Sequence, residues 1–181
     1  MIRQAAEADL PGIFAIYDHE VLHGTATFDT EPKSPAGRLE WLRDDGDGKY
    51  PILVAEAEAG GGVAAEAAPT RGSPAIAGWA RLYAWSNRCA YARAAENAVY
   101  VHRDHRGRGV GHALLAELIR LSPQRGIHVL LARIVEGNPA SVALHEAHGY
   151  QTIGVMRRVG EKFGRVLDVR LMDRHLDQVA P

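Results

Sequence analysis

The chain has 181 residues, of which 46% are hydrophobic and 24% are charged, and its formal net charge is −1. These values are typical of a globular protein that buries a core, and they provide no overall positive charge to favour a nucleic-acid partner. No apolar run approaches the roughly 18 residues of a membrane-spanning helix. The first residues, MIRQAAEADL, lack the apolar segment of an export signal. We therefore expect a cytoplasmic protein with no membrane and no nucleic-acid partner.

Two helices are expected in the first third of the chain. Residues 10–21 repeat apolar side chains at helical spacing, with Asp9 as the N-cap and Pro11 in the first turn. A second helix is expected over residues 34–45, where Ser34 is a suitable N-cap and a proline follows it.

Two more helices are expected in the second half. Residues 111–121 form an apolar helix that Pro123 ends. Residues 138–149 form another, with Asn138 as the N-cap and Gly149 at its C-terminal end.

Segments between these helices have the apolar character of strands. We expect strands at residues 1–5, 50–58, 75–85, 96–102, 127–135, 150–160 and 165–176. The Gly- and Pro-rich stretch at about residues 58–75 is expected to be a mobile loop rather than a domain linker, because neither side of it has enough elements for a core. Helices alternating with strands indicate a single mixed α/β domain over residues 1–181.

The stretch VYVHRDHRGRGVGHALLAELI runs from a strand into a helix through three glycines, Gly107, Gly109 and Gly111, set among arginines. Backbone N–H groups at a helix N-terminus are unpaired and carry partial positive charge, and glycines let a phosphate approach them closely. The loop therefore favours a pyrophosphate site. The alternative is a surface turn with solvated arginines, since short glycine motifs are common by chance.

The spacing of these residues narrows the class of ligand. The dinucleotide motif G-x-G-x-x-G and the P-loop motif are both absent. What remains, Arg106-x-x-Gly109-x-Gly111 after a strand, resembles the coenzyme A pyrophosphate motif of the GNAT-type N-acetyltransferases.

The resemblance covers nearly the whole chain. The segments ATFDTEPKSP, YPILVAE, WSNRCAYARAAENAVYV, HRGRGVG, NPASVALHEAHGY and VGEKFGRVLDV resemble the phosphinothricin and methionine sulfoximine N-acetyltransferase branch. The long loop near residues 58–75, the residues Arg93, Ala94 and Ala95, and Pro123 depart from the pattern. The resemblance implies a GNAT-type domain with a central, mostly antiparallel sheet flanked by helices, and a homodimer.

The resemblance also implies which residues contact acetyl-CoA. These are Val99, Tyr100, Val101, Arg106, Gly107, Arg108, Gly109, Val110, Gly111, His112, Asn138 and Ser141. Val99 and Val101 would offer backbone groups to the pantetheine arm, with one N–H facing the thioester oxygen; simple core packing is the alternative. Asn138 would lie near the pantetheine, or would only cap its helix.

Two residues are implied in the chemistry. Glu96 would be the general base that accepts a proton from the acceptor ammonium group; the alternative is a solvent-exposed glutamate at a strand edge. His145 could protonate the departing thiolate, or it could be a packed or surface histidine.

The implied acceptor pocket contains Phe28, Arg88 and Tyr91 together with Glu96. Arg88 would bind a carboxylate or phosphinate of the acceptor with two parallel hydrogen bonds. The alternative is a surface arginine and two core aromatic side chains.

No metal is expected. His102 and His105 lack a third ligand nearby, and the segment His145-Glu146-Ala-His148 does not match H-E-x-x-H. The single cysteine, Cys89, excludes an internal disulfide and is typical of a reducing compartment. Direct acetyl transfer needs no cysteine as a carrier.

We therefore expect an enzyme that moves acetyl from acetyl-CoA to the α-amino group of a small amino acid or analogue. An acetyltransferase for a polyamine, an aminoglycoside or a peptide N-terminus is the first alternative. A CoA-binding regulatory module without turnover is the second.

Overall fold

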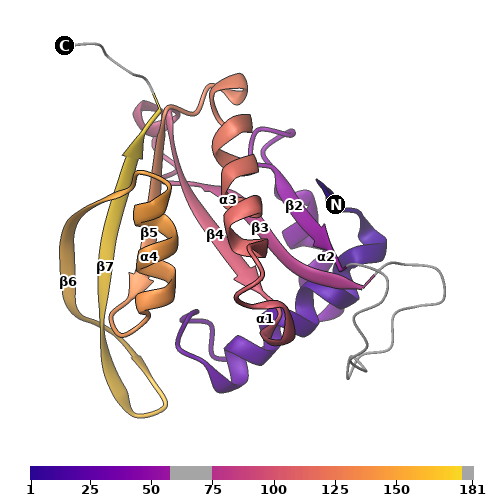
Figure 1. Cartoon of the computed structure of the whole chain (residues 1–181), viewed down its shortest axis with the longest axis horizontal. Helices are drawn as coiled ribbons and strands as arrows, with labels where there is room; N and C mark the ends of the chain where they lie inside the picture. The colour runs from indigo at the N-terminus through magenta and orange to yellow at the C-terminus, as the bar shows by residue number, and fades with distance from the viewer. Residues whose placement is uncertain (58–74, 177–181) are drawn as a thin grey trace.

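The structure is a computed structural model, and it describes residues 1–57 and 75–176. Seven strands form one sheet in the order β1-β2-β3-β4-β5-β7-β6 (Figure 1). Their bounds are β1 Ile2–Gln4, β2 Ile52–Glu56, β3 Ile76–Ala84, β4 Ala94–Val101, β5 Val129–Val135, β6 Gln151–Lys162 and β7 Arg165–His175. Each strand lies at or within a few residues of an expected segment. Most of the loop expected near residues 58–75 lies outside the described residues.

All neighbouring strands are antiparallel except β4 and β5, which run parallel. Their pairing covers only three positions, from Ala94 opposite Val129 to Glu96 opposite Leu131. Beyond Glu96 the two strands diverge, and each continues paired only with its outer neighbour (Figure 1). The mostly antiparallel sheet expected from the resemblance is confirmed, and its single parallel pair opens a gap between two strands.

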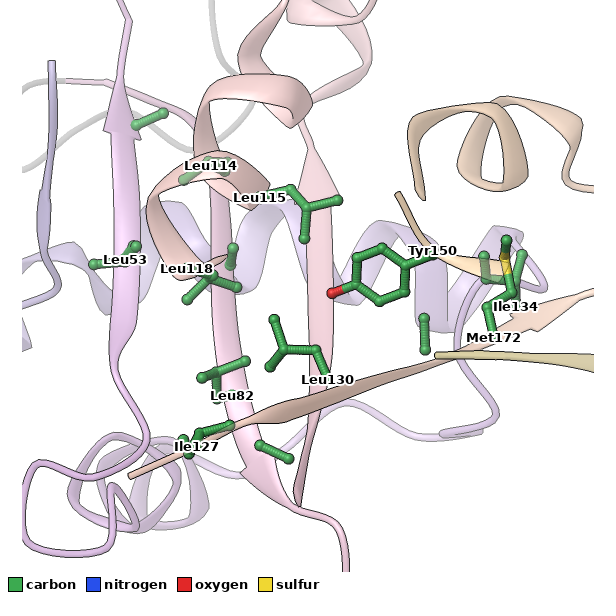
Figure 2. Close-up of a cluster of buried hydrophobic side chains, with 14 residues drawn as sticks. Leu53, Leu82, Leu114, Leu115, Leu118, Ile127, Leu130, Ile134, Tyr150 and Met172 are labelled. Carbon is green, nitrogen blue, oxygen red and sulfur yellow. The ribbon is translucent and has the colours of Figure 1, made fainter. Parts of the chain in front are cut away.

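Helices cover both faces of the sheet. The helices α1 (Leu10–His23) and α2 (Pro35–Arg43) pack on one face around Trp79, whereas α3 (Val110–Leu121) and α4 (Pro139–Ala147) cover the other. On that second face Leu114, Leu115 and Leu118 of α3 are fully buried against strand residues (Figure 2). Burial of each such side chain stabilises the fold by roughly 1.5–3 kcal/mol.

The N-terminal helix caps follow the sequence at two of three expected places. The Ser34 side chain accepts a hydrogen bond from the Gly37 N–H, and the Asn138 side chain accepts one from the Ser141 N–H. The expectation that Asp9 caps α1 is wrong. Its carboxylate instead accepts a hydrogen bond from the Ala6 N–H and pairs with the guanidinium of Arg3 at 2.6 Å. A strong charged partner on β1 has displaced the local cap.

No helix in the described part of the chain is long and apolar enough to cross a bilayer.

Candidate functional site

A cleft of about 1120 Å³ opens where β4 and β5 diverge. It extends from the glycine loop before α3 to side chains of β6 and of the segment after α1. The volume exceeds the roughly 300–1,000 Å³ of ordinary small-molecule sites. The cleft can therefore hold a long ligand together with a second, smaller one.

The glycine loop forms one end of this cleft. Gly107 and Gly109 have φ angles of 72° and 79°, and Gly109 is the N-cap of α3. A Cβ atom added at either position would meet no atom within 4 Å, so the space beside the helix N-terminus is open. Gly111 differs, because an added Cβ would lie 3.3 Å from Leu144 and 3.5 Å from Val101. Two of the glycines thus supply the left-handed turn, and the third lies where a side chain would press on Leu144.

The basic residues of the loop fall into two groups. The Arg106 guanidinium lines the cleft, where it donates to the Glu20 carboxylate at 2.6 Å and to the Val101 carbonyl at 3.3 Å. His112 also lines the cleft, and its Nδ1 lies 3.2 Å from Nε2 of His148. Arg108 is exposed and is not among the lining residues.

The backbone of β4 directs a row of N–H and C=O groups toward the cleft, of which the Val101 carbonyl already accepts from Arg106. The His102 N–H donates to the Ala77 carbonyl, and the Trp85 N–H donates to the Ala94 carbonyl. Because hydrogen-bonded and non-bonded positions alternate in an antiparallel pair, the even-numbered residues of β4 bond to β3. Val99 and Val101 therefore direct their N–H and C=O groups toward the gap. An extended ligand lying between the two strands can hydrogen-bond to groups with this orientation.

A buried polar network borders the gap, and two of its members, Asn97 and His145, line the cleft. His145 Nδ1 is 2.7 Å from the Ser141 carbonyl, which can only accept, so Nδ1 carries the proton. His145 Nε2 then accepts from the Asn97 amide at 2.8 Å, and the Asn97 oxygen accepts from the Tyr150 hydroxyl at 2.7 Å. Burial lowers the pKa of His145 below its ordinary value.

This network bears on the expectation that His145 protonates a thiolate. Only 3% of the residue is exposed, and both ring nitrogens already have partners within the protein. The geometry favours the alternative of a packed histidine that holds Asn97 and the first turns of α4. Sequence reasoning missed Asn97 and Tyr150, because their partners are distant in the chain.

Glu96 lies at the point where β4 and β5 part. Its carboxylate accepts two hydrogen bonds from the Arg133 guanidinium, 2.8 Å to Nε and 2.5 Å to Nη2. The Glu96 side chain is 15% exposed and that of Arg133 is 53% exposed. The ion pair raises the pKa of Arg133. Glu96 is not the solvent-exposed glutamate of the alternative interpretation, since it lines the cleft.

Sequence reasoning missed Arg133. The available signal was one charged residue within the apolar strand LLARIV, on the opposite strand face from the buried Ala132 and Ile134.

Side chains from separate segments form the other end of the cleft. Phe28 lines it, 40% exposed, and its ring packs on Gly160, where any larger residue would clash. Tyr83 and Trp85, at the end of β3, line it as well. Arg88 and Tyr91 are exposed in a short 3-10 helix beyond β3 and are not among the lining residues. The single chain therefore brings Phe28 and Glu96 together and leaves Arg88 and Tyr91 outside.

A buried lysine holds the segment that carries Phe28. Lys162, at the end of β6, is 3% exposed and donates to the Thr27 carbonyl at 2.8 Å and the Glu20 carbonyl at 3.2 Å. This tie between the β6–β7 hairpin and the end of α1 was not expected from the sequence.

Within residues 1–57 and 75–176, no group of three or more His, Cys, Asp or Glu side chains is arranged to hold a metal ion.

Comparisons with known proteins agree with this geometry. Residues 25–150 match the model of the acetyltransferase (GNAT) family. The L-methionine sulfoximine/L-methionine sulfone acetyltransferase of Pseudomonas aeruginosa is 39% identical over 97% of this chain and 94% of its own length. The phosphinothricin N-acetyltransferase of Streptomyces coelicolor is 36% identical over 97% of this chain and 95% of its own.

A solved structure has the same fold and includes the acetyl donor. It is a GNAT superfamily phosphinothricin acetyltransferase from Sinorhizobium meliloti in complex with AcCoA, with a TM-score of 0.85 and 36% identity over 98% of this chain and 89% of that one.

Proposed function

Because the chain belongs to the acetyltransferase (GNAT) family, we propose that it transfers acetyl from acetyl-CoA to the α-amino group of a small amino acid or analogue. The observation that carries the proposal is the place of Glu96, between the glycine loop and the pocket that contains Phe28. The names of relatives that act on methionine sulfoximine and phosphinothricin support this acceptor class.

Different residues along the cleft would bind different parts of acetyl-CoA. The N–H groups at the start of α3, with Arg106, would hold the pyrophosphate. The backbone edge of Val99 and Val101 that faces the gap would hold the pantetheine arm, and one N–H there would donate to the thioester oxygen as negative charge develops on it.

Glu96 would act as the general base. It accepts one proton from the acceptor ammonium group, so the neutral amine can attack the thioester carbon. The C–N bond forms and the C–S bond breaks, the attacking nitrogen loses a second proton, and the departing thiolate takes up one proton to leave as the free thiol, so the net reaction releases the single proton that Glu96 accepted. Because both His145 nitrogens are engaged, we assign no role in protonating the thiolate to this residue.

The direct test is release of free thiol from acetyl-CoA across a panel of amines. The panel should contain L-methionine sulfone, phosphinothricin, a polyamine, an aminoglycoside and a short peptide. We expect the two amino-acid analogues to be acetylated with the highest kcat/KM. Preference for another amine would contradict the acceptor class. Tight binding of acetyl-CoA without thiol release from any amine would favour a regulatory module.

The proposal includes a homodimer. Strand β6 lies at the edge of the sheet and exposes Ile153, Val155 and Val159, while Phe163 and Val166 are exposed on the same hairpin. An exposed apolar patch on an edge strand is typical of a surface that associates. Ile153→Asp should shift the mass measured by light scattering from dimer to monomer; a wild-type monomer would contradict the dimer.

The proposed reaction takes place in the cytoplasm. The exposed free thiol of Cys89 is compatible with a reducing compartment.

A further inference from the structure

The geometry points to Arg133 as the residue that binds the carboxylate of the acceptor, with Glu96 and Arg133 together recognising the zwitterionic head group of an α-amino acid. This inference rests on the proposed function and deepens it, because it assigns the acceptor class to two named side chains.

The position of the pair is the first argument. Glu96 on β4 and Arg133 on β5 lie just where the pairing of these strands ends, and both line the cleft. Arg133 is about half exposed and its guanidinium lies 5.9 Å from the centre of the Trp85 ring. An ion pair with one partner this open can exchange partners with a ligand, unlike a pair locked in the core.

The charges of the pair are the second argument. An α-amino acid carries an ammonium and a carboxylate on one carbon atom. Glu96 and Arg133 place a carboxylate and a guanidinium side by side, 2.5–2.8 Å apart. When an amino acid enters, its carboxylate can take the two guanidinium donors, and its ammonium can take the Glu96 oxygens. Two ion pairs replace one, with the planar fork of arginine matched to the carboxylate.

The places of the other cations are the third argument. Of the lysine and arginine residues that line the cleft in the described chain, Lys33 pairs with Asp29 on the segment after α1, Arg106 pairs with Glu20 at the glycine end, and Arg133 alone pairs with Glu96. Arg88, the residue that the sequence suggested for this role, is not among the lining residues. Arg133 is therefore the guanidinium placed beside the base.

The exchange has a consequence for catalysis. Both oxygens of Glu96 accept hydrogen bonds from Arg133 before the acceptor arrives. An acceptor carboxylate that draws Arg133 away releases those oxygens for the ammonium proton. An amine without a carboxylate would have to leave the ion pair intact or leave the Arg133 guanidinium without an anionic partner. Polyamines are therefore disfavoured as acceptors.

The test compares L-methionine sulfone with its methyl ester, which keeps the amine but lacks the anionic carboxylate. We expect Arg133→Ala to lower kcat/KM for the acid by at least about tenfold and for the ester by less than about threefold. Arg133→Lys should restore kcat/KM for the acid only in part, since lysine keeps the positive charge but lacks the two parallel N–H donors of the guanidinium. Because the ratio of acid to ester is compared between each variant and the wild type, the different basicities of the two amines cancel.

Arg170→Ala is the matched control. Arg170 makes a similar ion pair with Glu136, 3.0 Å apart, on the neighbouring strand β7, and neither residue lines the cleft. This variant should keep the wild-type ratio of acid to ester, and thermal unfolding should show that both variants fold.

Several outcomes separate the inference from the proposed function. An equal loss for acid and ester in Arg133→Ala would mean that Arg133 only positions Glu96, and would overturn the inference while the proposed function stands. Loss of acid preference in Arg88→Ala but not in Arg133→Ala would overturn it in favour of Arg88. A wild type that acetylates neither compound, nor any other amino acid, would overturn both.

Discussion

The two ends of the cleft are built in different ways. The glycine end comes mainly from one continuous stretch, residues 99–111, with Glu20 of α1 holding the Arg106 side chain, and its backbone groups take their direction from positive φ angles and from strand alternation. The other end, which we propose binds the acceptor and call the acceptor end, combines side chains of the segment after α1, the end of β3, the diverging strands β4 and β5, and the β6–β7 hairpin. Ligand binding at the glycine end should therefore tolerate most side-chain substitutions and weaken when a glycine is replaced. The acceptor end should respond to single side chains, some of them outside the cleft.

The largest expected effect is at Glu96, which belongs to the acceptor end. Glu96→Gln keeps the size of the side chain but removes the proton acceptor. Turnover should fall by about 10²–10⁴-fold, the usual contribution of a general base, while the Kd of acetyl-CoA measured by calorimetry stays within about twofold. A Gln variant that turns over within a few-fold of wild type would show that another base operates. A parallel loss of acetyl-CoA binding would show that the two ends are not independent.

The glycine end is tested with two glycines that share one backbone conformation. Gly109 and Gly126 have φ angles of 79° and 69°, and neither has an atom within 4 Å of an added Cβ. Both Ala variants should lose about 1–2 kcal/mol of stability from left-handed backbone strain. Only Gly109→Ala should also raise the Kd of acetyl-CoA, by about tenfold or about 1.4 kcal/mol, because its methyl group would stand at the phosphate approach. Equal affinities of the two variants for acetyl-CoA would contradict the assignment of the glycine loop as the pyrophosphate site.

A smaller effect is expected from the tie behind Phe28. Lys162→Met leaves the Thr27 and Glu20 carbonyls without their buried donor, which should lower the free energy of unfolding by about 1–3 kcal/mol. It should also reduce kcat/KM for the acceptor more than the affinity for acetyl-CoA. The control is Lys49→Met, which removes an exposed lysine bond to the Ala92 carbonyl and should change neither. A loss of acetyl-CoA affinity equal to the loss in kcat/KM would mean that the tie supports the whole cleft.

The smallest effect concerns pH. Since burial lowers the pKa of His145, the folded protein binds fewer protons at this site than the unfolded chain below the ordinary histidine pKa of about 6.5. The free energy of unfolding should therefore fall as the pH drops below about 6.5. Above that pH, His145 should contribute no pH dependence to it. Urea unfolding of His145→Gln should show a shallower fall. His102 and His148, whose pKa values burial also lowers, remain in both proteins, so the difference isolates His145. Identical slopes would contradict a neutral, buried imidazole.

The amino-acid sequence by itself determined the elements and the glycine end. Ser34 and Asn138 act as the caps that their residue types favour, and the two left-handed glycines precede α3 as the motif requires. These features depend on neighbours within a few residues, so local chemistry decides them. The Asp9 cap failed because Arg3, on a strand that the sequence pattern could not pair with α1, offered a stronger partner.

The tertiary structure alone decided the acceptor end. No local pattern shows that Arg133 meets Glu96 across 37 positions, or that Lys162 reaches Thr27 across 135. The same holds for His145, for which the resemblance left open a proton donor or a packed histidine, and whose two ring nitrogens meet Asn97 and Ser141 in the folded chain. Which atoms a charged side chain meets depends on strand order and register, and both are set by burial of the whole sheet rather than by the residues beside it.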